Sequence, residues 1–259
     1  MNGLRDQDQN RRSPAQDDRG ASAPGGAIVP VPRGNLLNVH VPPDAPPPTE
    51  LIDSLAASTQ QVDAFRELRT RLLNLGAGLG RTHFTTMVAP VTAGSGGDFV
   101  ARNLAAAFTL EENRVAILVD CNLRNPTQHR VFGVNGDEGG LFDYLDRTQG
   151  AVALRATALP RLHLIPAGRP HTQPREYFSS RTMREVLGAF QQTPCFVVLD
   201  APPVKGSPDA RILSDLADLV VLVAGYGIDT TESISEAAAL FDKRKFAGVV
   251  LNEASAEAK

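Results

Sequence analysis

The stretch that decides the fold runs from Phe84 to Arg124 and reads FTTMVAPVTAGSGGDFVARNLAAAFTLEENRVAILVDCNLR. An apolar run from Phe84 to Val88 predicts a strand, and a glycine-rich loop and a helical segment follow it. A second apolar run, Val115 to Val119, ends on Asp120. This order is typical of a β-loop-α-β unit. Its loop is expected at the carboxyl end of the first strand, where open α/β sheets bind their ligands.

The chemistry of this loop differs from what its position suggests. Such a loop normally holds phosphates, because its glycines let backbone N–H groups point inward and a lysine and a hydroxyl complete the shell. Counting back from the helix places the lysine position at Gly97 and the magnesium-binding hydroxyl at Asp98. Losing the lysine removes charge-assisted bonds of about 1.5 to 3 kcal/mol each. A carboxylate about 4 Å from a phosphate adds about 4 kcal/mol of repulsion, so weak or absent nucleotide binding is expected.

The composition excludes several classes of protein. The chain has 259 residues, is 42% hydrophobic and carries a net charge of −3, which fits one α/β domain and argues against nucleic acid as a partner. Cys121 and Cys195 each lie beside an apolar run, so small buried hydrophobes are expected rather than a disulfide. No signal segment and no run of about 18 to 20 apolar residues is present. A cytoplasmic protein is therefore expected, recruited to the inner face of the membrane only by a partner.

The first part of the chain has a different character from the rest. Residues 1–48 are rich in Pro and Gly, and we expect them to form a disordered arm that precedes a domain of residues 49–259. Within the arm, the apolar patch Ala27 to Val41 is either a short docking motif or, as the favoured alternative, part of a spacer.

The rest of the chain alternates between helical and strand patterns. A helix capped by Thr49 or Asp53 is expected to run through Leu75, since its apolar residues recur at helical spacing. A helix from Ser179 or Ser180 through Phe190 is also expected. Further strands are predicted at Leu162–Ile165, Phe196–Leu199 followed by Asp200, Leu219–Ala224 and Phe246–Asn252. The predicted fold is an α/β, doubly wound parallel sheet with helices on both faces.

A set of motifs in a fixed order carries a family resemblance. The motifs are DAFRELRTRL, the glycine-rich loop with its NLA helix, VDCNLRNPTQHRVFG, LHLIPAGRP, VVLDAPPV and FAGVVLN. Over residues 60–252 the chain resembles the bacterial tyrosine kinases of capsule and exopolysaccharide synthesis. These kinases are related to the MinD- and ParA-type P-loop ATPases with a deviant Walker motif. The resemblance implies a P-loop NTPase-like fold.

The resemblance also assigns roles to residues of this chain. It implies a nucleotide-binding loop and two acidic motifs at strand ends, with Asp120, Asn122 and Asp200 at the catalytic positions and Asp120 and Asp200 as magnesium ligands. The loop comprises Gly94, Ser95, Gly96, Gly97, Asp98 and Phe99. The family pattern has a lysine, a hydroxyl and a carboxylate where this chain has Gly97, Asp98 and Asn122. These three departures in one site indicate a degenerate member.

The resemblance implies partners as well. In the family an arginine-bearing helix mediates ring-like assembly, and its pattern maps to Asp63, Arg66 and Arg69. These residues are spaced i, i+3, i+6 and are expected to share one face of the first helix, which is either a subunit contact or a solvated charged face. A membrane chain-length co-polymerase is the implied partner, together with copies of this chain or an active paralogue. The family also carries a tyrosine-rich tail, whereas this sequence ends NEASAEAK. No autophosphorylation of such a tail is therefore expected.

Three hypotheses of function follow. The first is a scaffold or regulator of exopolysaccharide assembly with little or no kinase activity, which does not use ATP and magnesium. The second is an active tyrosine autokinase or ATPase of the same pathway, with Arg102 or Lys205 in place of the missing lysine. The third is a positioning ATPase of the partition or Min type. The sequence does not indicate which polysaccharide is made.

Overall fold

The computed structural model describes residues 51, 59–136, 139–148, 152, 154–171, 175–191 and 193–252. The predicted arm of residues 1–48, its patch Ala27 to Val41 and the predicted helix caps Thr49 and Asp53 lie outside the described residues. None of the described helices has both the length and the apolar character needed to cross a bilayer.

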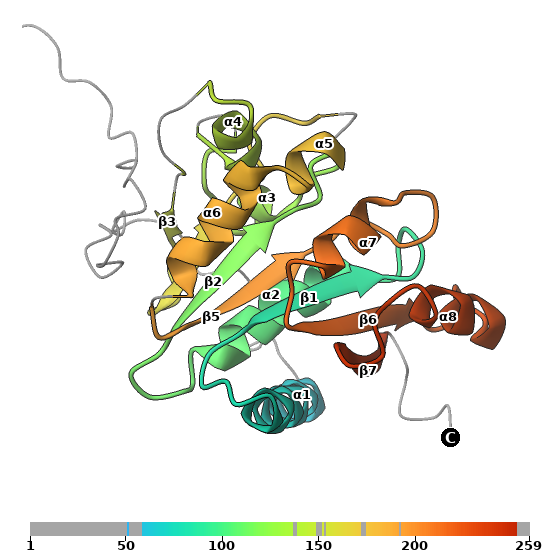
Figure 1. The fold of residues 1–259 in the computed structure, drawn as a ribbon. Coiled ribbons are helices and arrows are strands. Elements are labelled where there is room, and N and C mark those ends of the chain that lie inside the picture. Colours follow the sequence, from blue (N-terminus) through green and yellow to red (C-terminus); the bar gives the residue numbers. More distant parts are fainter. Residues whose placement is uncertain are drawn as a thin grey trace, which may run out of the picture.

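A seven-stranded sheet forms the centre of the described part of the chain, in the order β3-β4-β2-β5-β1-β6-β7 (Figure 1). Neighbouring strands are parallel except β3, which pairs antiparallel with β4 at one edge. The strands are β1 (Thr85–Pro90), β2 (Val115–Asp120), β3 (Arg155–Ala156), β4 (Leu162–Ile165), β5 (Cys195–Asp200), β6 (Leu219–Gly225) and β7 (Phe246–Asn252).

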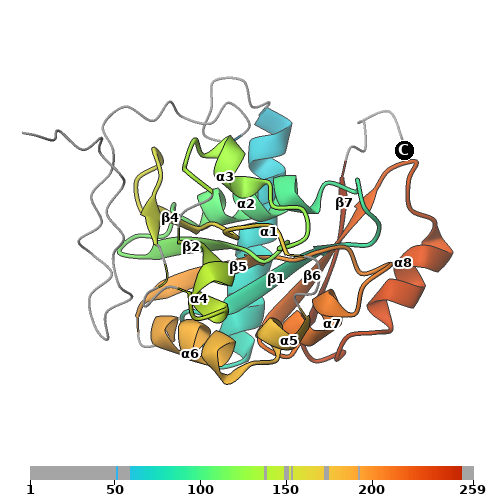
Figure 2. The ribbon, with the colours of Figure 1, turned by 90° about the horizontal axis from the view of Figure 1, so that it is seen from above.

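Helices cover both faces of this sheet, as the edge-on view in Figure 2 shows. The helices are α1 (Thr59–Gly78), α2 (Gly97–Phe108), α3 (Gln128–Val131), α4 (Leu141–Leu145), α5 (Arg175–Phe178), α6 (Arg181–Phe190), α7 (Asp209–Ser214) and α8 (Thr231–Ala238). Side chains of α1 and α2 form one apolar core with the sheet, and side chains of α4 to α8 form the other. The predicted doubly wound α/β fold is confirmed.

The central strands β1, β5 and β6 are buried along their whole length, which explains why their sequences are mostly apolar. On the α2 side, Phe108 stacks on Phe196 with ring centroids 4.4 Å apart, and Phe84 meets both rings edge-on. α1 joins this layer through Phe65, whose ring lies 6.0 Å from that of Phe99. Helix α2, which carries the glycine-rich loop at its start, is therefore held firmly between α1 and the sheet.

The sequence patterns placed most elements correctly. β4 and β7 have the predicted bounds, and Ser180 caps α6 by accepting a hydrogen bond from the backbone N–H of Met183. The edge strand β3 was not predicted, because two residues are too few to show an alternating pattern. Both cysteines are buried and unbridged, as expected.

Candidate functional site

The glycine-rich loop between β1 and α2 has the shape of a phosphate loop. Gly94 and Gly96 have φ values of 90° and 83°, a left-handed conformation that favours glycine. A Cβ atom on Gly96 would collide with the side chain of Asn252, whose Nδ2 donates to the carbonyl oxygen of Ser95 at 3.3 Å. The end of β7 therefore supports the loop from one side.

Asp229, after β6, holds the loop from a second direction. Its two carboxylate oxygens accept hydrogen bonds from Thr92 Oγ1 and Ser95 Oγ, both at 2.6 Å, and from the backbone N–H of Gly225 at 2.9 Å. Burial alone would raise the pKa of Asp229, but these hydrogen bonds outweigh it, so the pKa lies below its ordinary value. Sequence reasoning did not identify Asp229, because its role depends on contacts between distant segments.

Gly97, at the lysine position, faces the ring of Pro90 at the end of β1. A Cβ atom built on Gly97 would lie 2.5 Å from Cδ and 2.8 Å from Cγ of Pro90. No side chain fits at residue 97 unless the proline moves, since heavy atoms do not pack at such distances. A side chain at position 97 would therefore require the ring of Pro90 to shift.

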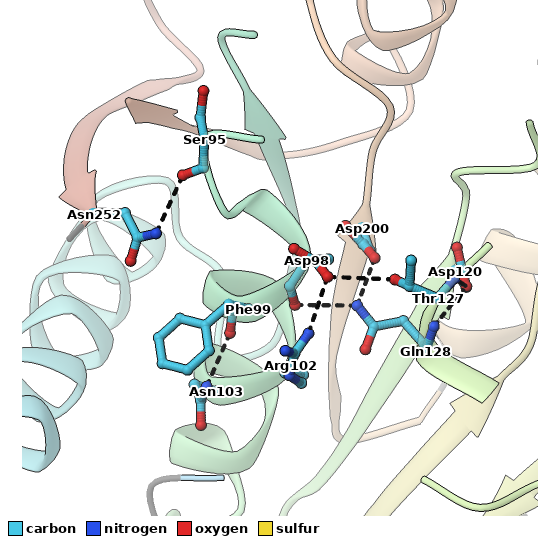
Figure 3. A network of polar contacts seen from close by, with 10 residues as sticks. All are labelled: Ser95, Asp98, Phe99, Arg102, Asn103, Asp120, Thr127, Gln128, Asp200 and Asn252. Atoms are coloured by element: carbon cyan, nitrogen blue, oxygen red, sulfur yellow. Dashed lines mark hydrogen bonds and ion pairs between the residues drawn. The ribbon is translucent and has the colours of Figure 1, made fainter. Parts of the chain in front are cut away.

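Asp98, at the hydroxyl position, is engaged within the protein (Figure 3). Its Oδ2 forms an ion pair with Arg102 Nη1 at 3.3 Å and accepts a long hydrogen bond from Thr127 Oγ1 at 3.5 Å. The Arg102 side chain is only 5% exposed, and its guanidinium lies over the ring of Phe99, 5.4 Å from the centroid. Arg102 is therefore not positioned to replace the missing lysine.

Asp120 and Asp200 lie side by side at the ends of neighbouring strands, where they are register partners of β2 and β5. Asp120 accepts hydrogen bonds from the backbone N–H groups of Asn122 (3.1 Å), Thr127 (3.2 Å) and Gln128 (3.1 Å). Both carboxylates lie at strand ends, as the sequence predicted, and the register of β2 and β5 places them next to each other.

Gln128 connects this carboxylate pair to the start of α2. Its Nε2 donates to Asp200 Oδ2 at 2.6 Å and to the carbonyl oxygen of Asp98 at 3.1 Å, and Figure 3 shows it reaching across the site. The Gln128 side chain thus lies beside the carboxylate that the family pattern assigns to the metal. Nothing in the sequence pattern had pointed to Gln128.

Two negative charges on Asp120 and Asp200 are unfavourable, because both carboxyl groups are buried next to each other. Burial raises the pKa of Asp120 to about 7; the three backbone hydrogen bonds oppose this rise and the charge of Asp98 adds to it. Burial also raises the pKa of Asp200 well above its ordinary value, and the neighbouring charge of Asp120 raises it further. The site therefore favours a proton or another cation on this pair.

A cavity of about 840 Å³ opens beside the loop. It brings together most of the predicted site: the loop glycines, Asp98, Asn122 and Asp200, with Gln61 of α1 and the Pro202–Pro203 segment on its other walls. Its two basic side chains are paired: Arg124 Nε lies 3.0 Å from Asp209 Oδ2, and Lys205 Nζ lies 3.4 Å from Glu236 Oε2. The cavity is large enough for a small-molecule ligand.

The three residues predicted for assembly do not form one face. Asp63 and Arg66 are exposed and pair with each other at 3.4 Å. Arg69 turns inward: its Nε lies 3.3 Å from Glu111 Oε1, and its Nη1 donates to the carbonyl oxygen of Ala107 at 3.2 Å. The reason is helical geometry, because six residues of an α-helix place Arg69 about 120° around the axis from Asp63.

A parallel sheet with a glycine-rich loop between β1 and α2, and acidic strand ends beside it, defines the P-loop class of α/β proteins.

Comparison with known proteins agrees with this class. No protein-family profile matches the chain. The tyrosine-protein kinase Wzc of Salmonella typhimurium is 30% identical over 194 residues, 74% of this chain and 26% of Wzc. The tyrosine-protein kinase YwqD of Bacillus subtilis is 29% identical over 192 residues, 73% of this chain and 80% of YwqD. The chain thus spans about a quarter of the length of Wzc.

Solved structures show the same fold. The chimerical protein CapA2B2 has a TM-score of 0.70 at 24% identity, covering 78% of this chain and 88% of that one. The kinase domain of the Escherichia coli tyrosine kinase ETK has a TM-score of 0.64 at 24% identity, covering 75% and 78%. MinD of Pyrococcus horikoshii has a TM-score of 0.51 at 18% identity, covering 64% and 68%. The chain is a homologue of bacterial tyrosine kinases, with the fold they share with MinD- and ParA-like ATPases.

Proposed function

We propose that this chain is a kinase-like scaffold or regulator of capsule or exopolysaccharide assembly, with a degenerate nucleotide site. The observation that carries the proposal is the close approach of the Pro90 ring to Gly97, where a side chain would begin. The ring of Pro90 fills the space in which a lysine at position 97 would begin. The chain has thus kept the loop that holds phosphates while closing the place from which the lysine reaches them.

The remaining residues fit ATP and magnesium poorly. Asp98 brings a carboxylate to the position of a magnesium-binding hydroxyl, and its partner is Arg102 rather than an open coordination site. Asp200 Oδ2 accepts a hydrogen bond from the amide of Gln128, and both oxygens of Asp120 accept from backbone N–H groups, so these carboxylates have fewer lone pairs left for a metal ion. Magnesium prefers several oxygen ligands in near-octahedral geometry. We therefore derive no phosphoryl-transfer step for this site.

The proposal includes a membrane partner. The homologues are tyrosine kinases, and the family resemblance implies a chain-length co-polymerase that recruits a cytoplasmic protein to the inner face of the membrane. The exposed pair Asp63 and Arg66 on α1 is the part of the predicted assembly motif that is available to a neighbour. Homo-oligomers, or mixed oligomers with an active paralogue, are the proposed forms.

A rescue experiment tests the proposal. We expect the double variant Gly97→Lys with Asp98→Ser to bind ATP and magnesium no better than the wild type, because Pro90 blocks the lysine. The triple variant that also carries Pro90→Gly is expected to gain at least about tenfold in affinity, equivalent to about 1.4 kcal/mol. Calorimetric titration measures both. Equal affinities for the double and triple variants, with both folded by circular dichroism, would contradict the role of Pro90.

One observation favours a second candidate, an active tyrosine kinase or ATPase. Lys205 lines the cavity on the side of the strand that ends in Asp200, and its ion pair with Glu236 is solvent-exposed. Such an exposed ion pair is weak, so the Lys205 ammonium group could leave Glu236 and reorient toward a bound phosphate at a small cost in free energy. Phosphotyrosine or released phosphate that depends on magnesium, and that Lys205→Ala abolishes, would establish this candidate in place of the scaffold. For the positioning ATPase, the likeness to MinD supports the fold alone.

A further inference from the structure

Within the part of the chain that the structure describes, the edge strand β7 has one unpaired side and exposed apolar side chains. It is the last strand of the sheet and pairs only with β6 within the described residues (Figures 1 and 2). Val249 and Leu251 on this strand are 44% and 53% exposed. An exposed apolar edge strand is a template for pairing with another extended segment, and proteins normally cover or blunt it.

The main-chain groups that face away from β6 belong to the same two residues. The carbonyl oxygen of Asn252 accepts a hydrogen bond from the backbone N–H of Tyr226, so Asn252 faces β6. Backbone groups alternate in direction along a strand, so those of Val249 and Leu251 face away from β6. An added strand would therefore pair with Val249 and Leu251 and place its own side chains beside theirs.

The sequence contains a segment that matches this edge. Residues 27–33 read AIVPVPR, within the apolar patch whose role the kinase resemblance leaves unexplained. If Val29 and Val31 face β7, their N–H and C=O groups are available for pairing. Pro30 and Pro32 then face outward, where a missing N–H costs nothing and prevents a further strand from adding.

We propose that residues 28–32 of this chain pair antiparallel with β7, with Val29 opposite Leu251 and Val31 opposite Val249. In hydrogen-bonded antiparallel pairs the opposing side chains lie on the same face, so the two valines cover the exposed Leu251 and Val249. The connection is long enough, since residues 33–50 can span up to about 60 Å before Leu51, which is buried in the same apolar core as Phe65. The occupant is the chain itself.

Amide hydrogen exchange of the full-length protein, followed residue by residue, tests the pairing. In the wild type, the amides of Val249 and Leu251 are expected to exchange slowly although their side chains are exposed. Val31→Pro removes an inward-facing N–H and is expected to speed their exchange by at least about tenfold. Ile28→Pro is the matched control, because residue 28 faces outward, and less than about a twofold change is expected for it.

Three results would overturn the proposal. Fast exchange at Val249 and Leu251 in the wild type would show that the edge is unpaired. Equal effects of Val31→Pro and Ile28→Pro would exclude pairing through alternate residues. Protection that disappears on dilution would assign the edge to a second copy of the chain. Circular dichroism of both variants guards against a change in the fold, and neither substituted residue lies in the described domain.

Discussion

Replacing Asp120 by Asn tests the electrostatic state of the candidate site. Asp120 is fully buried beside Asp200, and its pKa rises from the ordinary 3.8 to about 7. Because the folded pKa is raised, the folded protein binds this proton more tightly than the unfolded chain does. The resulting stabilisation is complete below the unfolded pKa and is lost as the pH rises through about 7.

The magnitude follows from the size of the rise. An increase from 3.8 to about 7 corresponds to a loss of about 4 kcal/mol of unfolding free energy between acidic and mildly alkaline pH, at 1.36 kcal/mol per pH unit. Because the site can relax around the charged pair, about 4 kcal/mol is an upper bound on this loss. A loss of about 2 kcal/mol is large enough to be detected in the test. In the Asp120→Asn variant the amide does not titrate, so this part of the pH dependence disappears.

The assay is urea unfolding of wild type and variant from about pH 5 to about pH 8, in the presence of a chelator. The side-chain amide of the Asp120→Asn variant also accepts one hydrogen bond fewer from the backbone, which lowers stability at every pH. The quantity compared is therefore the change of unfolding free energy with pH. The wild type is expected to lose at least about 2 kcal/mol more than Asp120→Asn over this range. The control Asp63→Asn, at an exposed carboxylate, should parallel the wild type. Parallel curves for wild type and Asp120→Asn would refute the reasoning.

Three further predictions concern the loop and α1. Arg69→Ala should lower the unfolding free energy by about 1 to 2 kcal/mol, because it removes a half-buried ion pair with Glu111. In the same urea titration Arg66→Ala should lower it by less than about 0.5 kcal/mol, because its ion pair with Asp63 is exposed. Equal losses for the two variants would contradict the inward placement of Arg69. Asp229→Asn should speed amide exchange in the loop around Ser95, because two short hydroxyl hydrogen bonds lose their charged acceptor; unchanged exchange would exclude this support. Arg66→Ala should reduce self-association or co-polymerase binding in sedimentation while circular dichroism stays the same, and unchanged mass and partner binding would return Arg66 to a solvated face.

The sequence was sufficient for the fold because its signals are local. Apolar runs such as Phe196–Leu199 report burial on both faces of a parallel strand, and the helical stretches between strands report the crossovers. The position of Asp120 and Asp200 also followed from sequence, since the carboxyl ends of parallel strands share one edge of a sheet.

The sequence was not sufficient for contacts between distant segments. Asp229 meets Ser95 across 134 positions, and Gln128 meets Asp200 across 72, and neither pair leaves a periodic signal. Pro90 and Gly97 are near in sequence, but their contact depends on how tightly the loop turns. Arg69 was placed wrongly because a spacing of three residues drifts around the helix axis.

The central proposal is that this kinase-like site binds nucleotide weakly or not at all. A calorimetric titration of the full chain with ATP, with and without magnesium, tests it most directly. The account predicts a dissociation constant weaker than about 0.1 mM under both conditions, since the lysine is absent and Asp98 repels phosphate. A micromolar dissociation constant that depends on magnesium would contradict it.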